Sequence, residues 1–530
     1  MPRPPNADKP GSYVPCNYCD KPLHWKGVSK HRINHCPKNP NSVKNTKTNS
    51  KRPRKRASNN TPDNTSVPTL SESTPEVTPA AQSSAASTTP CDCCHQDIEA
   101  DLWTLHHAVC VINNYKRQAA EALEKGASMI VGGKMKFPKN SWGRKQYQYF
   151  ELIITKADIG EALTPAEYCS KQRHELNNRN FVVCATVEEA LVVILHGRIV
   201  IPILILNSSS SSLLQAQAAH TVNKYLQNLI SNKGMVDLHV FNKKLEKDGT
   251  SKVERLLTTK AIEIFMDPKK TTNMLNLRCC RANPIPDAMA AMNSMQAIPH
   301  LTDRLANGKN MQVKIPEVKA PPPPRWKSRQ AKNAAEEPVQ RVLSLDLLEI
   351  SQSFSLLANM GAIHQPHVDR CGVITCIRCE QGAKLWITWI LLTAEEWRKW
   401  LDEGTLTLRP GTAIYIPQGA TLIQPAQTLH APLSLSDVLM SGTMHWDERD
   451  IAPAFRGTQM DLEVRNSTNE DCPVDVYEML ELVLELWEEE VVRGDAEPLK
   501  WGSAEELAEC KALFAVRVIV FLAIGPLMTY

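Results

Sequence analysis

Short runs of alternating apolar and polar residues fill most of the segment 340–450, and turn residues separate the runs. Many short strands with few helices among them are typical of an antiparallel barrel or a double-sheet jelly roll. Within this segment, residues 361–386 contain an extended stretch, a strand, a turn at residues 380–382 and a second strand that begins at Lys384. We therefore expect the largest domain to be built around residues 361–386.

The segment upstream of this core, residues 141–310, alternates helical and strand patterns without a chemical motif of its own. Residues 180–185 have the composition of a strand, and Thr186 with Glu189 forms a capping-box signature that predicts a helix directly behind it. Residues 197–206 are almost continuously apolar, which predicts a buried strand and is too short for a membrane span. We expect these elements to be the N-terminal part of the same module.

Three further patterns follow the core stretch. Thr393 opens a second capping-box signature, and the helix behind it is expected to end at Gly404. Residues 405–420 then predict two strands joined by an Arg-Pro-Gly turn. Residues 460–530 combine helical apolar spacing with many acidic residues, and their last part is strongly apolar. We interpret that last part as a packed C-terminal helix, with a membrane tail anchor as the alternative.

Composition separates the remaining segments. Residues 38–89 are rich in Ser, Thr, Asn and Pro and poor in large apolar residues, so we expect a disordered linker. Residues 311–335 are Pro-rich and basic, which indicates a surface insertion. The sequence thus predicts a multidomain α+β chain with these segments: a zinc finger at 12–37, the linker at 38–89, a second finger at 90–112, the module at 141–310, the insertion at 311–335, the β-barrel core at 340–450 and an acidic helical region at 460–530.

Charge and cysteine usage indicate the cellular setting. The first 60 residues are strongly basic, whereas residues 461–510 are strongly acidic. The cluster KRPRKR at residues 51–56 has the composition of a nuclear import signal or a phosphate-contacting patch, with a solvated charge run as the alternative. No apolar core of a secretion signal is visible near the first residue, and the 16 cysteines fall in short spaced groups, which favours metal sites over disulfides. We expect a nuclear protein.

The first group of cysteines has the spacing of a zinc finger. Cys16 and Cys19 form C-x-x-C, and His31 and Cys36 follow at a spacing that can close a tetrahedral zinc site. His35 is the rival fourth ligand. The order and spacing resemble those of BED-type zinc fingers, which bind DNA.

A second group repeats the same gap. Cys91 and Cys94 form C-x-x-C, His106 follows Cys94 at the same separation as in the first group, and Cys110 comes next. We expect a second zinc site here, with a structural or protein-contacting role because its segment lacks the basic residues of the first. Two other residues compete as ligands in this group, Cys93 and His107.

The chemistry of the core stretch begins with the H-x-D pair His367 and Asp369. A residue and its second neighbour point to the same face of an extended strand. One imidazole and one carboxylate on one face are two thirds of the facial triad that holds Fe(II) in non-haem oxygenases. A polar surface pair is the alternative, and a third ligand and a 2-oxoglutarate anchor would decide in favour of iron.

Such candidates exist in residues 353–446, where G-A-I-H-Q-P-H-V-D, G-V-I-T, G-A-K-L-W, L-R-P-G-T-A-I-Y-I-P and T-L-H-A-P-L-S-L-S-D-V-L-M-S-G-T-M-H-W occur in order. This run resembles the JmjC branch of the Fe(II)- and 2-oxoglutarate-dependent dioxygenases, especially the JmjC-like proteins of fungi. The resemblance implies a double-stranded β-helix (jelly-roll or cupin) with flanking helices. It also implies that His430 completes the iron triad with His367 and Asp369, that Lys384 pairs with the far carboxylate of 2-oxoglutarate, and that Thr375 hydrogen-bonds the same carboxylate.

The implied reaction is oxidation of a protein side chain at a carbon–hydrogen bond. Demethylation of methyl-lysine on histones is one candidate, and hydroxylation of another protein is the second. The fingers and the basic arm would bring the module to DNA or chromatin, and no membrane partner is favoured.

One stretch departs from the family pattern. The family has its distal histidine close behind an Ile-Pro pair, whereas here residues 418–427 intervene before His430. Without a gap the ligand position would fall on Leu422, which cannot bind metal, so we interpret residues 418–427 as an insertion. His445 is a third option at a later family position, and we expect His364 at the rim of the site.

Two other classes of function stay open at this point. A JmjC fold that has lost its metal through the insertion would be a catalytically inactive DNA- or chromatin-binding protein. A DNA-binding protein derived from a mobile element is the weaker reading, because no acidic nuclease triad accompanies the fingers.

Overall fold

The computed structural model of the chain divides into two units, Met1–Ser84 and Ala85–Tyr530. In the first unit, β1 (Tyr13–Pro15) and β2 (Pro22–His24) pair antiparallel on either side of the first C-x-x-C in the sequence. The ligands expected for the first finger, the 38–87 part of the linker, the basic cluster and the 311–335 insertion lie outside the described residues. The structure describes residues 13–15, 22–24, 88–91, 94–99, 102–131, 135–206, 221–230, 235–244, 253–275, 277, 292–307, 348, 352–463, 468, 472–473, 475–494 and 500–524.

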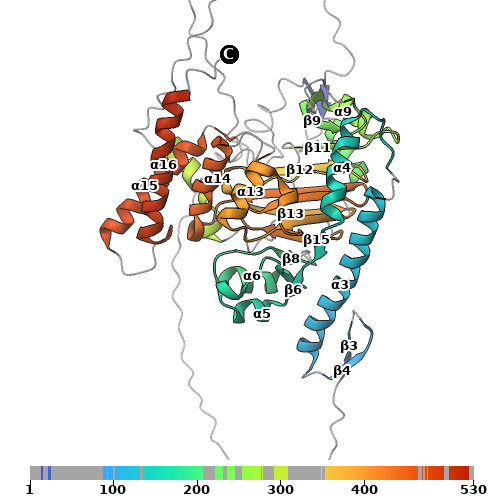
Figure 1. Ribbon diagram of the computed structural model, residues 1–530, viewed down its shortest axis with the longest axis horizontal. Coiled ribbons are helices and arrows are strands. Elements are labelled where there is room, and N and C mark those ends of the chain that lie inside the picture. Colours follow the sequence, from blue (N-terminus) through green and yellow to red (C-terminus); the bar gives the residue numbers. More distant parts are fainter. Residues whose placement is uncertain are drawn as a thin grey trace, which may run out of the picture. The chain divides into compact units, whose positions relative to one another are not determined.

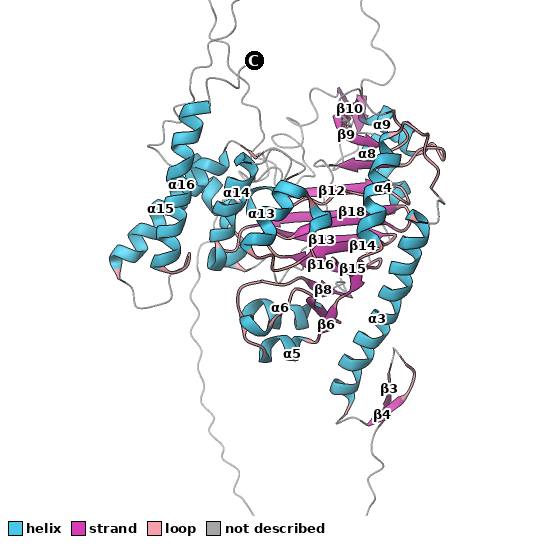
Figure 2. Ribbon diagram, viewed as in Figure 1, coloured by secondary structure: helices cyan, strands magenta, loops and turns pink. Residues whose placement is uncertain are grey.

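The centre of the second unit is a large sheet of ten strands (Figure 2). Four neighbouring strands form its middle, in the order β12 (Ser353–Ala358), β18 (Val438–His445), β13 (Ile374–Gln381) and β16 (Thr421–Gln424). All three pairings among them are antiparallel. The outer strands are β10 (Glu254–Leu257), β9 (Met235–Val240) and β11 (Thr272–Leu275) on one flank, and β8 (Ile203–Ile205), β7 (Asn180–Cys184) and β6 (Glu161–Leu163) on the other.

A smaller sheet contains β17 (Leu429–Ser434), β14 (Lys384–Trp389), β15 (Thr412–Ile416) and β5 (Asp158–Ile159), in that order. Isolated bridges add the segment before Asp369 to the free side of β17. Apolar side chains from both sheets belong to one continuous core.

Successive strands of the chain are distributed over both sheets. From residue 353 onward, β12 lies in the large sheet, the H-x-D segment joins the small one, β13 returns to the large sheet, and β14 and β15 belong to the small one. Of the last three strands, β16 and β18 belong to the large sheet and β17 belongs to the small sheet. The H-x-D pair and the start of β17 therefore meet at one end of the two sheets.

Helices surround these sheets, with α14 to α16 at one side and α3 at the other (Figure 1). The described helices are α3 (Trp103–Ile130), α4 (Trp142–Ile154), α5 (Pro165–Ser170), α6 (Val187–His196), α8 (Val222–Ile230), α9 (Thr258–Phe265), α11 (Ala297–Asn307), α13 (Ala394–Glu403), α14 (Ala452–Glu463), α15 (Asp475–Arg493) and α16 (Ala504–Ile524). Short 3₁₀ turns are η3 (Arg173–Glu175), η4 (Asn293–Met295), η5 (Arg370–Gly372), η6 (Thr405–Thr407) and η7 (Glu448–Asp450). Among the described helices, none is long and apolar enough to cross a membrane.

The α+β class predicted from the sequence is confirmed, as are several local elements. The Thr393 side chain accepts from the Glu396 amide in a reciprocal capping box, and α13 ends at Gly404, whose φ of 85° suits glycine. Two details differ from the prediction. Residues 405–407 form η6 instead of a strand, and residues 418–427, which we interpret as an insertion, are not a single loop because β16 occupies their middle.

The second finger is not a separate piece. Helix α3 carries His106 and Cys110 and then continues to Ile130, far beyond the predicted boundary at residue 112. The Tyr115 hydroxyl donates to the Tyr415 carbonyl and accepts from the Tyr415 amide, at 3.2 and 3.0 Å, which joins α3 to β15. The cysteine–histidine group is therefore fixed to the β-sheet unit through one helix.

Helix α14 lies directly against the turn that follows Asp369. Gly372 has a φ of 57°, and a Cβ atom there would lie 1.9 Å from the Pro453 carbonyl oxygen. Gly457 of the same helix faces the Gly372 backbone in turn. Two glycines thus allow the close approach of helix and turn, and this contact holds the chain just behind the H-x-D pair.

Candidate metal centre

His367 and His430 face each other across two antiparallel strand segments. Their backbones exchange both hydrogen bonds, at 3.0 Å from the His367 amide and 2.9 Å from the His430 amide. Residues that pair directly in this way place their side chains on one face of the sheet. The two imidazole rings accordingly lie 4.3 Å apart between centroids, and both are buried.

Each imidazole is held in a defined tautomer. Nδ1 of His367 lies 2.7 Å from the Gln365 carbonyl oxygen, and Nδ1 of His430 lies 3.0 Å from the Thr428 carbonyl oxygen. A carbonyl only accepts hydrogen bonds, so Nδ1 of His367 carries the proton. At His430 we assign the proton to Nδ1 because the Thr428 carbonyl is its nearer partner, while Nε2 of Gln424 lies 3.2 Å from the same Nδ1. The Nε2 lone pairs are therefore left for a metal ion, the arrangement that carbonyl partners enforce in metal sites.

Burial keeps both rings neutral. It lowers the pKa of His367 to about 3, an effect that neighbouring His430 reinforces, and it also lowers the pKa of His430. Neutral imidazole is the form that coordinates a metal. The site is therefore in its coordinating form at neutral pH.

Asp369 has one carboxylate oxygen engaged and one directed at the histidines. Its Oδ2 accepts from the Thr375 hydroxyl and, at 3.0 Å, from Nε2 of Gln424. Its Oδ1 lies 3.8 Å from Nε2 of His430. One ligand atom from each of His367, Asp369 and His430 lies within 4.8 Å of the others, so the three could hold one metal ion.

The Gln424 side chain was missed by the sequence analysis, because it lies in the stretch interpreted as an insertion. Its Oε1 accepts from Nε1 of Trp386 at 2.8 Å, which fixes the amide so that Nε2 points to Asp369. The alternation of β16 was the available signal: the sequence T-L-I-Q between two turns has a strand composition. The structure therefore adds Gln424 as a residue that orients Asp369.

We expect Gln424→Asn to weaken metal binding about tenfold or more, because the shorter amide cannot bridge Trp386 and Asp369. The Kd would be measured by titrating the protein with Mn²⁺ and following the spectrum of the free ion. Mn²⁺ is suitable because it prefers nitrogen and oxygen ligands to thiolates. Gln427→Asn is the matched control, since asparagine tolerates the φ of 55° at that position. Equal Kd values for both variants would contradict the role of Gln424.

Lys384 is a buried cation next to this group. Trp386 stacks on His430, with ring centroids 4.9 Å apart and an angle of 8°, and Nζ of Lys384 lies 5.7 Å from the Trp386 ring. No hydrogen bond or ion pair joins the Lys384 ammonium group to any described residue. Burial lowers its pKa to about 8. A buried ammonium without an anionic partner is costly, which indicates that an anion belongs beside it.

A small cavity of about 40 Å³ adjoins the three ligands. His364 forms part of its wall, so the prediction of a rim position is wrong: the ring is buried, 5.2 Å from His367, and its Nε2 lies 2.8 Å from Nδ2 of Asn273. His239 lies beyond it, 5.9 Å from His364. The rest of the wall is mostly apolar and comes from both sheets.

The alternatives for the third ligand lie elsewhere. Leu422 pairs with Ile377 inside the large sheet. Nδ1 of His445 lies 3.2 Å from the Met295 carbonyl oxygen, and its Nε2 lies 3.0 Å from the Thr443 hydroxyl. Neither belongs to the group formed by His367, Asp369 and His430.

The structure also brings together the second cysteine–histidine group. Ligand atoms of Cys91, Cys94, His106 and Cys110 lie within 4.8 Å of one another, with Sγ of Cys94 3.3 Å from Nε2 of His106. The short hairpin of β3 (Thr88–Pro90) and β4 (Asp97–Glu99) presents the first two, and α3 presents the others. Burial and hydrogen bonds with the other two thiols raise the pKa of Cys110 to about 12, so a bound cation is needed to keep it a thiolate at neutral pH.

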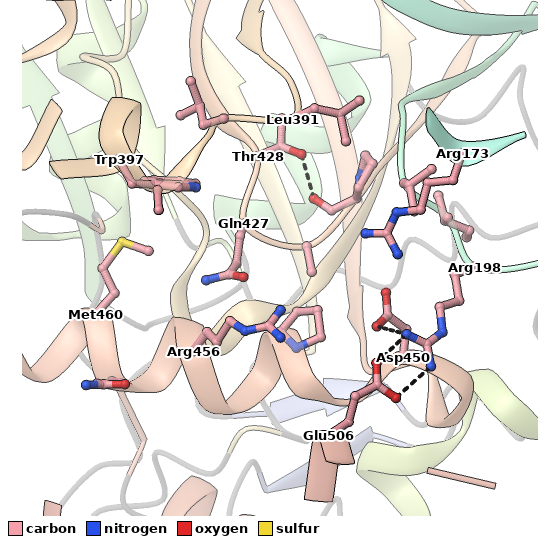
Figure 3. A pocket seen from close by; sticks show the side chains of 18 of the residues that line it. Arg173, Arg198, Leu391, Trp397, Gln427, Thr428, Asp450, Arg456, Met460 and Glu506 are labelled. Carbon is pink, nitrogen blue, oxygen red and sulfur yellow. Dashed lines mark hydrogen bonds and ion pairs between the residues drawn. The ribbon is translucent and has the colours of Figure 1, made fainter. Parts of the chain in front are cut away.

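A larger pocket of about 550 Å³ lies at the same end of the sheets (Figure 3). Gln427 and Thr428 of the turn before β17 line it, as does Leu391, just behind β14. In Figure 3, Arg173 and Arg456 reach toward its centre from opposite walls. Arg198 is engaged in ion pairs with Asp450 and Glu506 on one side, and Trp397 and Met460 form an apolar wall on the other.

Comparison with known proteins gives no family for the chain: no protein-family model matches it, and no curated protein matches it either. The resemblance to JmjC enzymes therefore rests on the sequence motifs quoted above. The geometry of His367, Asp369, His430 and Lys384 is an independent observation beside it.

Proposed function

We propose that the chain is an Fe(II)- and 2-oxoglutarate-dependent dioxygenase of the JmjC kind that acts on a protein side chain. One observation carries the proposal: two Nε2 lone pairs and one carboxylate oxygen converge next to a buried lysine that has no anionic partner among the described residues. The donor set fits iron, because two neutral imidazoles and one carboxylate are the ligands of non-haem Fe(II) oxygenases. When bound, iron with 2-oxoglutarate and dioxygen supplies the oxidation of an unactivated carbon–hydrogen bond.

The order of strands supports the fold that this function needs. We infer that the eight segments from β12 to β18, with the H-x-D segment counted as the second, form a double-stranded β-helix. They alternate between two facing sheets that share a core, and the candidate ligands come from the second and seventh segments. β16 is the sixth segment in this count, so residues 418–427 supply part of the barrel instead of displacing His430.

The residues of this chain have distinct tasks in the proposed reaction. The Gln365 and Thr428 carbonyls hold the two imidazoles, and Thr375 and Gln424 hold Asp369. The Thr375 hydroxyl thus donates to the carboxylate of Asp369 in this structure, and no hydrogen bond joins it to Lys384. Lys384 would bind the far carboxylate of 2-oxoglutarate by a charge-assisted hydrogen bond.

Binding of 2-oxoglutarate requires the small cavity to widen. About 40 Å³ has room for little more than one water molecule. Leu356 and Met444 line the cavity, and a methionine side chain adapts its shape at low cost. Movement of such apolar side chains would open the path from the ligands to Lys384.

The larger pocket is our candidate for the protein substrate. It adjoins the turn that leads into His430, and it combines guanidinium groups with the apolar wall of Trp397 and Met460. Methyl-lysine on histones and a hydroxylated side chain of another protein are the two substrate candidates. We further propose that zinc binds the two finger groups and that the N-terminal finger and basic arm tether the module to DNA or chromatin in the nucleus.

Succinate formation from 2-oxoglutarate in the presence of Fe(II) tests the proposal. We expect the wild-type chain to form succinate even without a protein substrate, at the low rate of uncoupled turnover, and His367→Ala to form none above background. The reason is that the variant loses one of three ligand atoms. Equal turnover in both proteins would exclude a dioxygenase reaction at this site, and no turnover or iron binding in either would favour the catalytically inactive DNA- or chromatin-binding protein.

A further inference from the structure

A third group of potential ligands lies behind the candidate iron site. Sγ of Cys371 lies 3.3 Å from Sγ of Cys472, and one oxygen of Asp461 completes a set of donor atoms within 4.8 Å of one another. Cys371 belongs to η5, Asp461 to α14, and Cys472 precedes α15. Two residues close in the sequence, Asp461 and Cys472, therefore meet a turn that lies 90 residues earlier in the chain.

The distances fit a shared cation better than a covalent bond. A disulfide requires about 2.0 Å between sulfurs, which is well short of the observed 3.3 Å. Two thiolates on one tetrahedral zinc ion, with bonds of about 2.3 Å, lie about 3.8 Å apart. A shift of a few tenths of an ångström would therefore suffice for zinc.

The surroundings hold Cys371 in place for such a role. Its backbone amide donates to Oδ2 of Asp461 at 2.7 Å, and its carbonyl accepts from Nε1 of Trp446 at 3.0 Å. These bonds fix a φ of 57°, a left-handed conformation that is unfavourable for cysteine.

We propose that Cys371, Asp461 and Cys472 form a structural zinc site, with a water molecule or another small ligand in the fourth position. Two thiolates and a carboxylate suit Zn²⁺, and the two thiol protons leave to solvent when the metal binds. The site ties the turn behind Asp369 to α14 and to the segment that leads into α15. It is a different centre from the nitrogen–oxygen triad of the proposed dioxygenase, and it does not depend on that function.

Zinc content per purified chain tests the site. We expect Cys472→Ser to contain one zinc ion fewer than the wild type, whereas Cys510→Ser keeps the full content. Cys510 is the matched control, because it is buried in α16 and belongs to none of the metal-ligand groups among the described residues. The same count is expected in His367→Ala as in the wild type, so loss of the iron site and loss of this site are separable.

A second variant controls for the case in which Cys472→Ser loses zinc only because it misfolds. Asp461→Asn keeps an oxygen that can accept from the Cys371 amide but removes the charge, and we expect it to weaken zinc binding at this site about tenfold or more while the circular dichroism spectrum is unchanged. Equal zinc content in the wild type and Cys472→Ser would overturn the proposal. A Cys371–Cys472 disulfide in the purified protein, detected as a mass lower by two protons without reductant, would also overturn it.

Discussion

Replacing His430 with alanine is expected to abolish iron binding and to lower succinate formation by about 1000-fold or more, equivalent to about 4 kcal/mol or more. His430 supplies one of three ligand atoms, and its Nε2 is the lone pair left free by the bond from Nδ1 to the Thr428 carbonyl. Without it, His367 and Asp369 leave too few ligands for a stable Fe(II) site. Iron content and succinate formation would be measured on the same preparation.

His445→Asn is the control for this experiment. His445 is also buried, and its ring nitrogens lie within hydrogen-bonding distance of the Met295 carbonyl and the Thr443 hydroxyl. The sequence left it open as a third ligand, so the two variants separate the alternatives directly. We expect His445→Asn to keep its iron. If it lost iron while His430→Ala kept it, the triad would be wrongly assigned.

Local signals in the sequence were sufficient for the parts of the site that are local in the chain. His367 and Asp369 are two residues apart on an extended segment, and the turn before Lys384 has a glycine at a φ of 88°. The capping box at Thr393 likewise depends on residues within one helical turn. Such features can be predicted because neighbouring residues alone determine them.

The contacts that complete the site connect distant residues, and no spacing rule predicts them. Gln424 reaches Asp369 and Trp386 only because β16 pairs with β13. The same reason explains why residues 418–427 were taken for an insertion: the motif was compared along the chain, whereas their role is set by a partner strand. The burial of His364 was not predicted either, because its partner Asn273 lies on a strand 91 residues away in the sequence.

The cysteine-containing groups show the same contrast. Cys91, Cys94, His106 and Cys110 repeat a recognisable gap and converge in the structure. Cys371 and Cys472 are separated by 101 residues and follow no motif. Short-range spacing therefore predicts the first group, whereas a group assembled from residues far apart in the sequence is visible only in the fold.

Replacing Lys384 with methionine is expected to raise the KM for 2-oxoglutarate about 10- to 100-fold. A hydrogen bond to a charged group contributes about 1.5–3 kcal/mol, and each 1.4 kcal/mol corresponds to a factor of about ten. We do not expect the variant to be less stable than the wild type. Burial lowers the lysine pKa in the folded chain to about 8, so the charged lysine destabilises the protein at neutral pH, and this penalty disappears only above the unfolded pKa. We therefore expect the Tm of the variant at pH 7 to equal or exceed that of the wild type.

Lys384→Arg and the pH dependence of KM distinguish an anion-binding lysine from a residue that merely fills space. Arginine stays charged at all accessible pH values, so its KM should be nearly constant with pH even if it is higher than that of the wild type. In the wild type, the KM for 2-oxoglutarate should rise as the pH passes about 8, because the free lysine then loses its proton. A lysine that only packed against Trp386 would give a flat profile in both proteins and a lower Tm in Lys384→Met. That combination would remove the basis for placing 2-oxoglutarate beside His367, Asp369 and His430.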